Sequence, residues 1–312
     1  MEFSGLQTEH FAAYSQEKWS SNVHNLARMR AKSVMMNLAE AIAQSLGEQL
    51  KQLERGSSSE VPTMQNHKKV DAQWIFWFRN KEARDSLNSF LETTPLDVTK
   101  IFNLSPQEKN LVLAVILREQ AIWVGLSLGP SAIVDRKNFA TKLEKTWELE
   151  RFLDLVKNLP DTFSLGAPQN LLATPQLSLD TMHEQMDTLQ GESLTWQIGR
   201  SFSKEEMLEK GGSMVSDINL ALTLLLPLYR FVEWHRDNDH IEVGKKIQEE
   251  KEQKRRAAAG YGVGDKVRMI SGLFAGKIGV VTETTTKGQV KVQVGKMSVV
   301  ANGTDVVAAQ PK

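Results

Sequence analysis

Val263-Gly-Asp-Lys-Val-Arg-Met-Ile-Ser-Gly-Leu-Phe-Ala-Gly-Lys-Ile-Gly-Val-Val281 is the stretch that decides the fold of the C-terminal end of the chain. Its first part alternates between the apolar residues Val267 and Met269 and the charged residues Lys266 and Arg268. A strand with one buried face has this period of two. The glycines that follow permit positive φ angles or close backbone contacts. The stretch therefore predicts a strand, a glycine-rich loop and a second strand.

More short strands are expected downstream of this stretch. Residues 289–294 alternate almost perfectly, and Lys287-Gly288 forms a turn before them. Val299-Val300 and Val306-Val307 are two further candidates. Short strands this close together argue for a small, strongly bent barrel. The fold class that we expect is α+β: a body of helices and antiparallel strands, followed by a small all-β barrel.

The glycine-rich segment resembles a KOW motif. The resemblance rests on Gly264-Asp-Lys-Val267 and on Gly272-x-Phe274-x-Gly276-Lys277-x-Gly279, and it covers residues 262–308. KOW motifs occur in SH3-like barrels of NusG transcription factors and of ribosomal proteins. The later piece, 290–306, looks more like the KOW domain of the MutS-like ribosome-rescue ATPases. The ATPase activity does not carry over, because the chain has no Gly-x-x-x-x-Gly-Lys-Ser/Thr.

The resemblance implies an SH3-like barrel that contacts RNA, the ribosome or RNA polymerase, or else a protein partner. Basic side chains would contact phosphates, Phe274 at the loop tip would stack on a base, and backbone amides beside the loop glycines would approach a phosphate closely. The candidate nucleic-acid-binding residues are Arg268, Gly272, Phe274, Gly276, Lys277, Gly279, Lys287, Lys291 and Lys296.

Charge is distributed unevenly over the 312 residues. Residues 1–244 hold 25 Lys and Arg against 32 Asp and Glu, a balance of −7, whereas residues 245–312 hold 13 against 6, a balance of +7. An acidic body with a basic tail places any polyanion contact at the C-terminal end. With no cysteine, disulfides and thiolate metal sites are excluded. No signal peptide is visible, which favours a cytoplasmic protein without a membrane anchor.

The body reads as a mixture of helices and strands. We expect helices at 7–18, 22–53, 81–92, 133–158 and 214–256, and strands at 72–79, 111–117, 121–128, 163–165 and 194–202. The runs at 111–117 and 121–128 predict a hairpin that is buried on both faces. Residues 55–62, with Gly and three Ser, predict a flexible loop. In the first long helix, Leu26, Met29 and Leu38 share one expected apolar face.

Three parts are expected along the chain: an α+β body at 1–244, a charged helical connector at 245–261 and the barrel at 262–312. A helix that is polar all round, as 245–256 would be, bridges solvent or touches a polar partner. The body also bears a scattered resemblance over residues 1–165 to the YktB-like family of bacterial proteins. That resemblance implies an α+β fold and no activity.

Candidate chemistry in the body is sparse. On a helix, His235, Asp239 and Glu242 would share a face and could hold a divalent ion, but no second ligand group accompanies them. Asp135 and Glu148 resemble a nuclease pattern that is too common to count. No nucleophile elbow is present. The aromatic strand 74–78 offers either a stacking face or core packing, and Trp77 and Arg79, on the face of Ile75, are the candidates for exposure.

The sequence therefore predicts a non-enzymatic accessory factor, without metal or cofactor, whose barrel contacts RNA, the ribosome or RNA polymerase. The body would bind a separate, unknown protein partner. Two alternatives stay open: a structural or assembly protein whose barrel docks on protein, and a nuclease with its site in the body.

Overall fold

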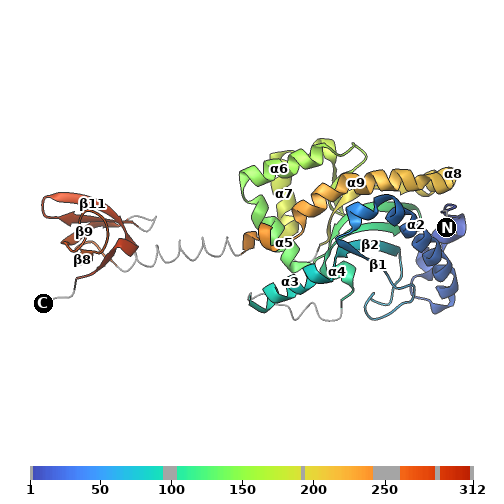
Figure 1. Cartoon of the computed structure of the whole chain (residues 1–312), viewed down its shortest axis with the longest axis horizontal. Coiled ribbons are helices and arrows are strands. Elements are labelled where there is room, and N and C mark those ends of the chain that lie inside the picture. The colour runs from blue at the N-terminus through green and yellow to red at the C-terminus, as the bar shows by residue number, and fades with distance from the viewer. Residues whose placement is uncertain (1–2, 94–103, 191–193, 242–260, 285–288, 310–312) are drawn as a thin grey trace. The chain divides into compact units, whose positions relative to one another are not determined.

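A computed structural model describes residues 3–93, 104–190, 194–241, 261–284 and 289–309. The chain divides into two compact units, Met1–Asp239, here called the body, and His240–Lys312, which contains the C-terminal strands (Figure 1). The expected connector at 245–261 lies almost entirely outside the described residues.

The body alternates helices with antiparallel strands, so the expected α+β class is confirmed. Its α-helices are α1 Thr8–Ala12, α2 Asn25–Leu50, α3 Lys81–Thr93, α4 Pro106–Lys109, α5 Ile133–Leu143, α6 Thr146–Lys157, α7 Leu179–Gln190, α8 Lys204–Lys210 and α9 Met214–Val232. Its strands are β1 Leu53–Ser57, β2 Gln73–Arg79, β3 Leu111–Leu117, β4 Ala121–Leu128, β5 Ser164–Ala167, β6 Asn170–Ala173 and β7 Trp196–Ser203.

The strands of the body form one sheet in the order β1-β2-β3-β4-β7-β5-β6. The predicted hairpin is confirmed: β3 pairs with β4 from Leu111↔Leu128 to Leu117↔Ile122, and every residue of β3 is buried. Burial of both faces explains why this segment is a continuous apolar run instead of an alternating one.

The two faces of the sheet have different surroundings. Helices α2 and α9 lie across one face (Figure 1), where Ile75, Leu113 and Val124 belong to the main core. On the other face, alternate residues such as Phe76 and Ala114 form a smaller cluster, with Trp74 and Trp123 half-buried beside it. Because successive strand residues point to opposite faces, this division follows from the register alone.

Several sequence predictions for the body are wrong in detail. Residues 53–57 form strand β1, not a flexible loop, because their backbone groups pair with β2. Gly56 is required there, since a Cβ would lie 2.5 Å from the Phe76 ring. The expected helix at 133–158 is two helices, α5 and α6. The final helix ends at Val232, and Glu233 is its C-cap.

The expected apolar face of α2 is also shifted. Leu26 and Met29 are exposed, while Leu38 is buried. The buried side chain near the start of this helix is Arg28, which donates to the backbone oxygens of Lys18, Ser21 and Glu60 at 2.7–2.9 Å. Charge-assisted hydrogen bonds of this kind let a guanidinium replace an apolar side chain in a packed position.

A buried ionic cluster joins distant parts of the body. The guanidinium of Arg79, on β2, donates to Asp135, on α5. Asp135 also accepts from the backbone N–H of Leu111 at 3.2 Å and of Trp234 at 2.8 Å. Glu233 lies 3.8 Å from Arg79 Nε and accepts from the hydroxyl of Tyr229 at 3.1 Å. Arg79 is therefore buried, so the exposed position that the strand pattern allowed for it is wrong.

Burial raises the pKa of Glu233 to about 7 from 4.5, against the opposing effect of Arg79. The folded protein then holds a proton on Glu233 that the unfolded chain has already lost between these two values. The stability that Glu233 contributes is therefore present below about pH 4.5 and is lost as the pH rises through 7. Between pH 5 and pH 8, the free energy of unfolding of Glu233→Gln should therefore decrease less than that of the wild type. Denaturant titrations at several pH values measure this difference.

The exposed Glu184→Gln on α7 is the control for this prediction, and it should keep the wild-type pH dependence. Other groups that titrate in the same range are common to all three proteins, so only the difference in slope reports Glu233. Identical slopes for Glu233→Gln and the wild type would contradict the assignment.

The described part of the C-terminal unit is all β. Its strands are β8 Lys266–Met269, β9 Ile278–Thr284, β10 Gln289–Val294, β11 Met297–Asn302 and β12 Val306–Ala308, paired antiparallel in the order β11-β10-β9-β8-β12. The small core between them contains Val267, Met269, Val281, Val290, Val292, Ala301 and Val306. The alternation in residues 266–269 and 289–294 thus predicted these strands and their inward faces.

The sheet of this unit must curl into a barrel. Its two edge strands, β11 and β12, are joined by Gly303–Asp305 alone. Four Cα steps from Asn302 to Val306 span at most about 14 Å. In a flat sheet, four strand spacings would separate these edges by roughly 19 Å. The hydroxyl of Tyr261 donates to the Val306 carbonyl at 3.0 Å, which fixes the segment before β8 to the last strand.

Within the described residues, one stretch, Lys204–Val232, is long and apolar enough to cross a membrane, and half of its most apolar window is buried inside the body. Its second part is α9, which packs on α2, β3 and β4. Helix α9 is therefore a core helix of the body.

Candidate nucleic-acid interface

Strand β8 presents its two cations to solvent. Lys266 and Arg268 are exposed, while Val267 and Met269 point into the barrel core. On the outer face, Arg268 lies between Ile278 of β9 and Val307 of β12 in the strand register. The alternation seen in the sequence therefore positions Arg268 at the centre of an exposed row.

The register brings three of the candidate cations to one end of the barrel. Arg268 pairs with Ile278, the residue after Lys277. On the other side of β9, Val280 pairs with Gln293, and Val294 pairs with Met297 across the next hairpin. Lys296, at the tip of that hairpin, therefore lies at the end where β9 begins. We call Arg268, Lys277 and Lys296 together the cationic edge.

The hairpin turn that carries Lys296 has only two central residues. Gly295 adopts a φ of 62°, and Lys296 follows it before the chain returns in β11. A glycine with positive φ at the first central position suits a tight hairpin. The side chain of Lys296 is exposed at the tip of this turn. Its position is therefore set by the backbone conformation of the turn and not by side-chain packing.

The glycine-rich loop between β8 and β9 is held in a fixed shape. Gly272 and Gly276 have φ angles of 77° and 82°. The N–H of Gly276 donates to the Met269 carbonyl at 2.7 Å, and that of Ile270 donates to the Asp305 carbonyl at 2.9 Å. These bonds tie the loop to the end of β8 and to the segment that closes the barrel.

Two expectations about this loop need correction. The amides at Ala275, Gly276 and Lys277 donate within the loop or to β8, so they are not free to approach a phosphate. Phe274 is half-buried, because its side chain packs against that small core. Leu273 is fully exposed instead. The loop therefore offers an apolar tip and not an aromatic stacking face.

The remaining candidates have other positions. Lys291 lies toward the other end of the barrel, where it pairs with Glu283 across the strands at 3.7 Å. Gly279 is buried, and a Cβ there would lie 2.4 Å from Val292 Cγ1, so its role is close packing of β9 on β10. Lys287 lies outside the described residues. Lys266, which the candidate set omits, is exposed on the same face as Arg268, and the alternation alone could have identified it.

The electrostatics of the cationic edge are unbalanced. Among the residues that the structure describes, no carboxylate lies within 4.0 Å of the charged nitrogens of Arg268, Lys277 or Lys296, whereas Lys291 is paired. Asp305, in the segment that joins the two edge strands, accepts from Ser271 Oγ at 2.8 Å and from Asn302 Nδ2 at 3.0 Å. Both carboxylate oxygens of Asp305 thus accept hydrogen bonds that hold the segment closing the barrel.

The candidate metal and nuclease residues of the body are not assembled. Because α9 ends at Val232, His235 and Asp239 do not share a helical face, and Glu242 lies outside the described residues. Within the described ranges, no group of three His, Asp or Glu side chains has the geometry of a metal site. Both oxygens of Asp135 are engaged in the buried ionic cluster, so they are not available to a catalytic ion.

No protein-family model matches this chain, and no curated protein matches it. The resemblance to KOW motifs therefore rests on the residues quoted above.

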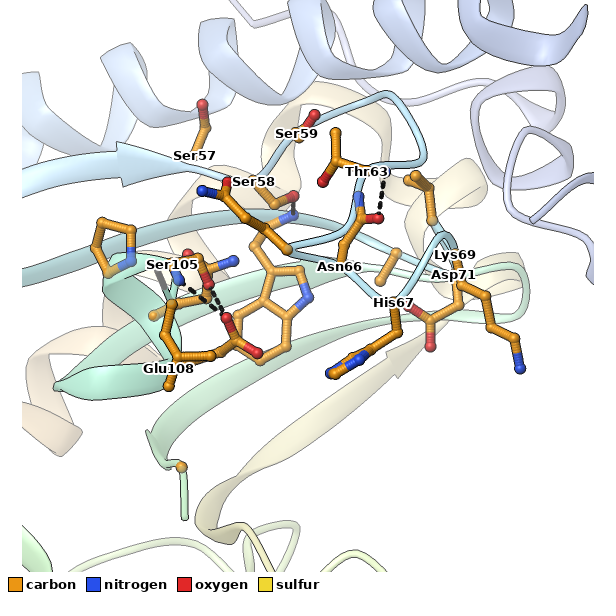
Figure 2. A pocket seen from close by; sticks show the side chains of 18 of the residues that line it. Ser57, Ser58, Ser59, Thr63, Asn66, His67, Lys69, Asp71, Ser105 and Glu108 are labelled. Carbon is orange, nitrogen blue, oxygen red and sulfur yellow. Dashed lines mark hydrogen bonds between the residues drawn. The ribbon is translucent and has the colours of Figure 1, made fainter. Parts of the chain in front are cut away.

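The body adds a feature that sequence reasoning missed: a polar cleft of about 810 Å³ beside β1 and β2 (Figure 2). Its lining comes from segments far apart in the chain, so no local pattern signals it.

Proposed function

We propose that this protein is a non-enzymatic accessory factor of the transcription or translation machinery. Its C-terminal barrel would contact RNA, either free or within a ribosome or an RNA polymerase complex, in the cytoplasm. The observation that carries the proposal is the cationic edge, where Arg268, Lys277 and Lys296 are exposed at one end of the barrel and no described carboxylate neutralises them. Phosphate groups are the partners that such unpaired cations favour.

The geometry supports backbone recognition more than base recognition. Cations on neighbouring strand ends match a sugar–phosphate chain, which carries charge at regular spacing. Base recognition on single strands generally uses exposed aromatic side chains, and Phe274 is half-buried. We therefore expect binding with little sequence preference. The KOW resemblance implies the same class of partner.

Protein docking is the second candidate function, and a specific observation favours it. The row that contains Arg268 is flanked by exposed Ile278 and Val307, and Leu273 is fully exposed at the adjacent loop tip. A partly apolar surface with a central arginine is also typical of protein interfaces. The body would supply a further interaction in either case.

The salt dependence of RNA binding tests the proposal. Three phosphate contacts to a single strand give a slope of about −2 in log K against log salt, so affinity should fall roughly 20-fold between 50 and 200 mM salt. Fluorescence anisotropy with a labelled single-stranded RNA and the full chain measures this change. Affinity that does not change with salt would contradict phosphate recognition. Partners that co-purify after nuclease treatment in high salt would instead favour protein docking.

A further inference from the structure

The cleft in the body lies over the sheet face that α2 and α9 do not cover. Its floor includes Trp74 of β2 and Ser127 of β4, which belong to the same face as the smaller apolar cluster. Figure 2 shows Ser105 and Glu108 on one side and His67, Lys69 and Asp71 on the opposite side. At about 810 Å³, the cleft falls within the roughly 300–1,000 Å³ of small-molecule sites.

The wall formed by residues 58–72 is a fixed structure. Asn66 Oδ1 accepts from the Thr63 N–H at 2.7 Å, and Asn66 Nδ2 donates to the Val61 carbonyl at 2.8 Å. His67 and Lys68 both adopt positive φ, at 54° and 59°. Non-glycine residues hold such angles only where the surrounding structure enforces them, and they concentrate at ligand-binding segments.

Neutral polar groups dominate the lining. Hydroxyl and amide side chains enter from every segment of the cleft, among them Ser57, Ser59, Gln65, Gln107, Ser127 and Thr195. Most of the charged groups are already engaged: Glu60 is paired with Lys32 at 2.7 Å, and Glu108 caps the turn at Ser105. Lys69 and Asp71 stand together at the rim (Figure 2). This lining does not select a polyanion or a strong cation.

Two groups of the floor have unused hydrogen-bonding capacity. Ser127 is only 3% exposed, yet its hydroxyl has no hydrogen-bond partner among the described residues. The indole N–H of half-buried Trp74 likewise donates to none of them, while the backbone N–H of Trp74 donates to Ser58 Oγ. Neither atom is among the fully enclosed side-chain atoms without a partner, so both open onto the cleft, where a ligand can replace water as their hydrogen-bond partner.

We propose that this cleft binds a neutral saccharide. A sugar ring has one flat face of C–H groups, which packs on an indole, and an edge of hydroxyls, which exchanges hydrogen bonds with serine, threonine and amide side chains. Trp74 supplies the indole, and Ser127 supplies a hydroxyl that opens onto the cleft. This function is independent of RNA binding by the barrel.

Saturation-transfer NMR and calorimetry with the full chain test the proposal. The probes are glucose, maltotriose, cellotriose and chitotriose, with adenosine and uridine as nucleoside probes. We expect saturable binding of at least one saccharide. Trp74→Leu should weaken this binding by at least about tenfold, and Ser127→Ala by about threefold. Trp147→Leu, which removes an exposed tryptophan on α6, is the matched control and should bind as the wild type does.

Circular dichroism on each variant separates lost binding from lost folding, and Ser127→Ala carries the test if Trp74→Leu does not fold. The proposal is overturned if none of the saccharides saturates the protein, if only the nucleosides do, or if the folded cleft variants keep wild-type affinity. Charge changes on the cationic edge should leave saccharide binding unchanged, so this test and that of RNA binding fail separately.

Discussion

Reversing the charges of the cationic edge should abolish RNA binding while the barrel stays folded. In Arg268→Glu/Lys277→Glu/Lys296→Glu, each phosphate contact becomes a repulsion. A loss of about 1 kcal/mol per contact, or ~3 kcal/mol in all, corresponds to a fall in affinity of at least roughly 100-fold. Folding should be preserved, because all three side chains are exposed and outside the apolar core. Anisotropy or co-sedimentation with ribosomes measures the loss.

The matched control reverses three exposed lysines of the body and changes the net charge by the same amount. Lys51→Glu/Lys81→Glu/Lys157→Glu alters side chains that are 68–82% exposed. If net charge alone governed binding, both triple variants would lose affinity equally, and the role of the cationic edge would be refuted. Retained binding in the cationic-edge variant would refute it as well.

The second large effect concerns the buried ionic cluster. Arg79→Met should destabilise the body by about 3 kcal/mol, near the lower end of the range for breaking a buried pair. The lower end is expected because the Asp135 carboxylate keeps two backbone N–H donors after Arg79 is removed. A loss of this size is a large fraction of the roughly 5–15 kcal/mol that stabilises a typical domain. Urea titration followed by tryptophan fluorescence measures it.

A second variant identifies the cause of this loss. Arg79→Met/Asp135→Asn removes the uncompensated charge but keeps an oxygen for the two N–H groups, so it should recover part of the stability. Lys157→Met, which removes an exposed pair with Asp154, should cost less than about 1 kcal/mol. A double variant that is less stable than Arg79→Met would show that the charge on Asp135 is not the source.

Much of the fold could be predicted because a buried face requires a regular pattern of apolar residues along a short stretch of sequence. The runs 111–117 and 121–128 contain no charged residue and a single polar one, Ser127, so a doubly buried hairpin follows. In residues 266–269 and 289–294, alternation identified both the strands and the outward position of Arg268. Such patterns depend only on neighbouring residues, so they can be recognised in the sequence without knowledge of the fold.

Two of the errors have the opposite origin, since they depend on residues far apart in the chain. Arg79 looked like an outward residue at a strand end, but Asp135, on a helix 56 positions later, makes its burial possible. Gly56 suggested a loop, but the Phe76 ring occupies the place of a side chain there. The cationic edge is an intermediate case. The sequence identified each of its three cations as a candidate, but only the strand register shows that they lie at the same end of the barrel.

The ionic cluster also constrains how the body is made. Its bonds link β2, the first residue of β3, the start of α5 and the residues just after α9, so its last contributor, Trp234, lies almost at the end of the body. During synthesis, Arg79 and Asp135 leave the ribosome long before Glu233 and Trp234 are available to them. Contacts this far apart along a chain form slowly. The nascent body therefore cannot complete its interior until nearly all of it has been translated, and until then it presents unfinished surfaces that chaperones recognise.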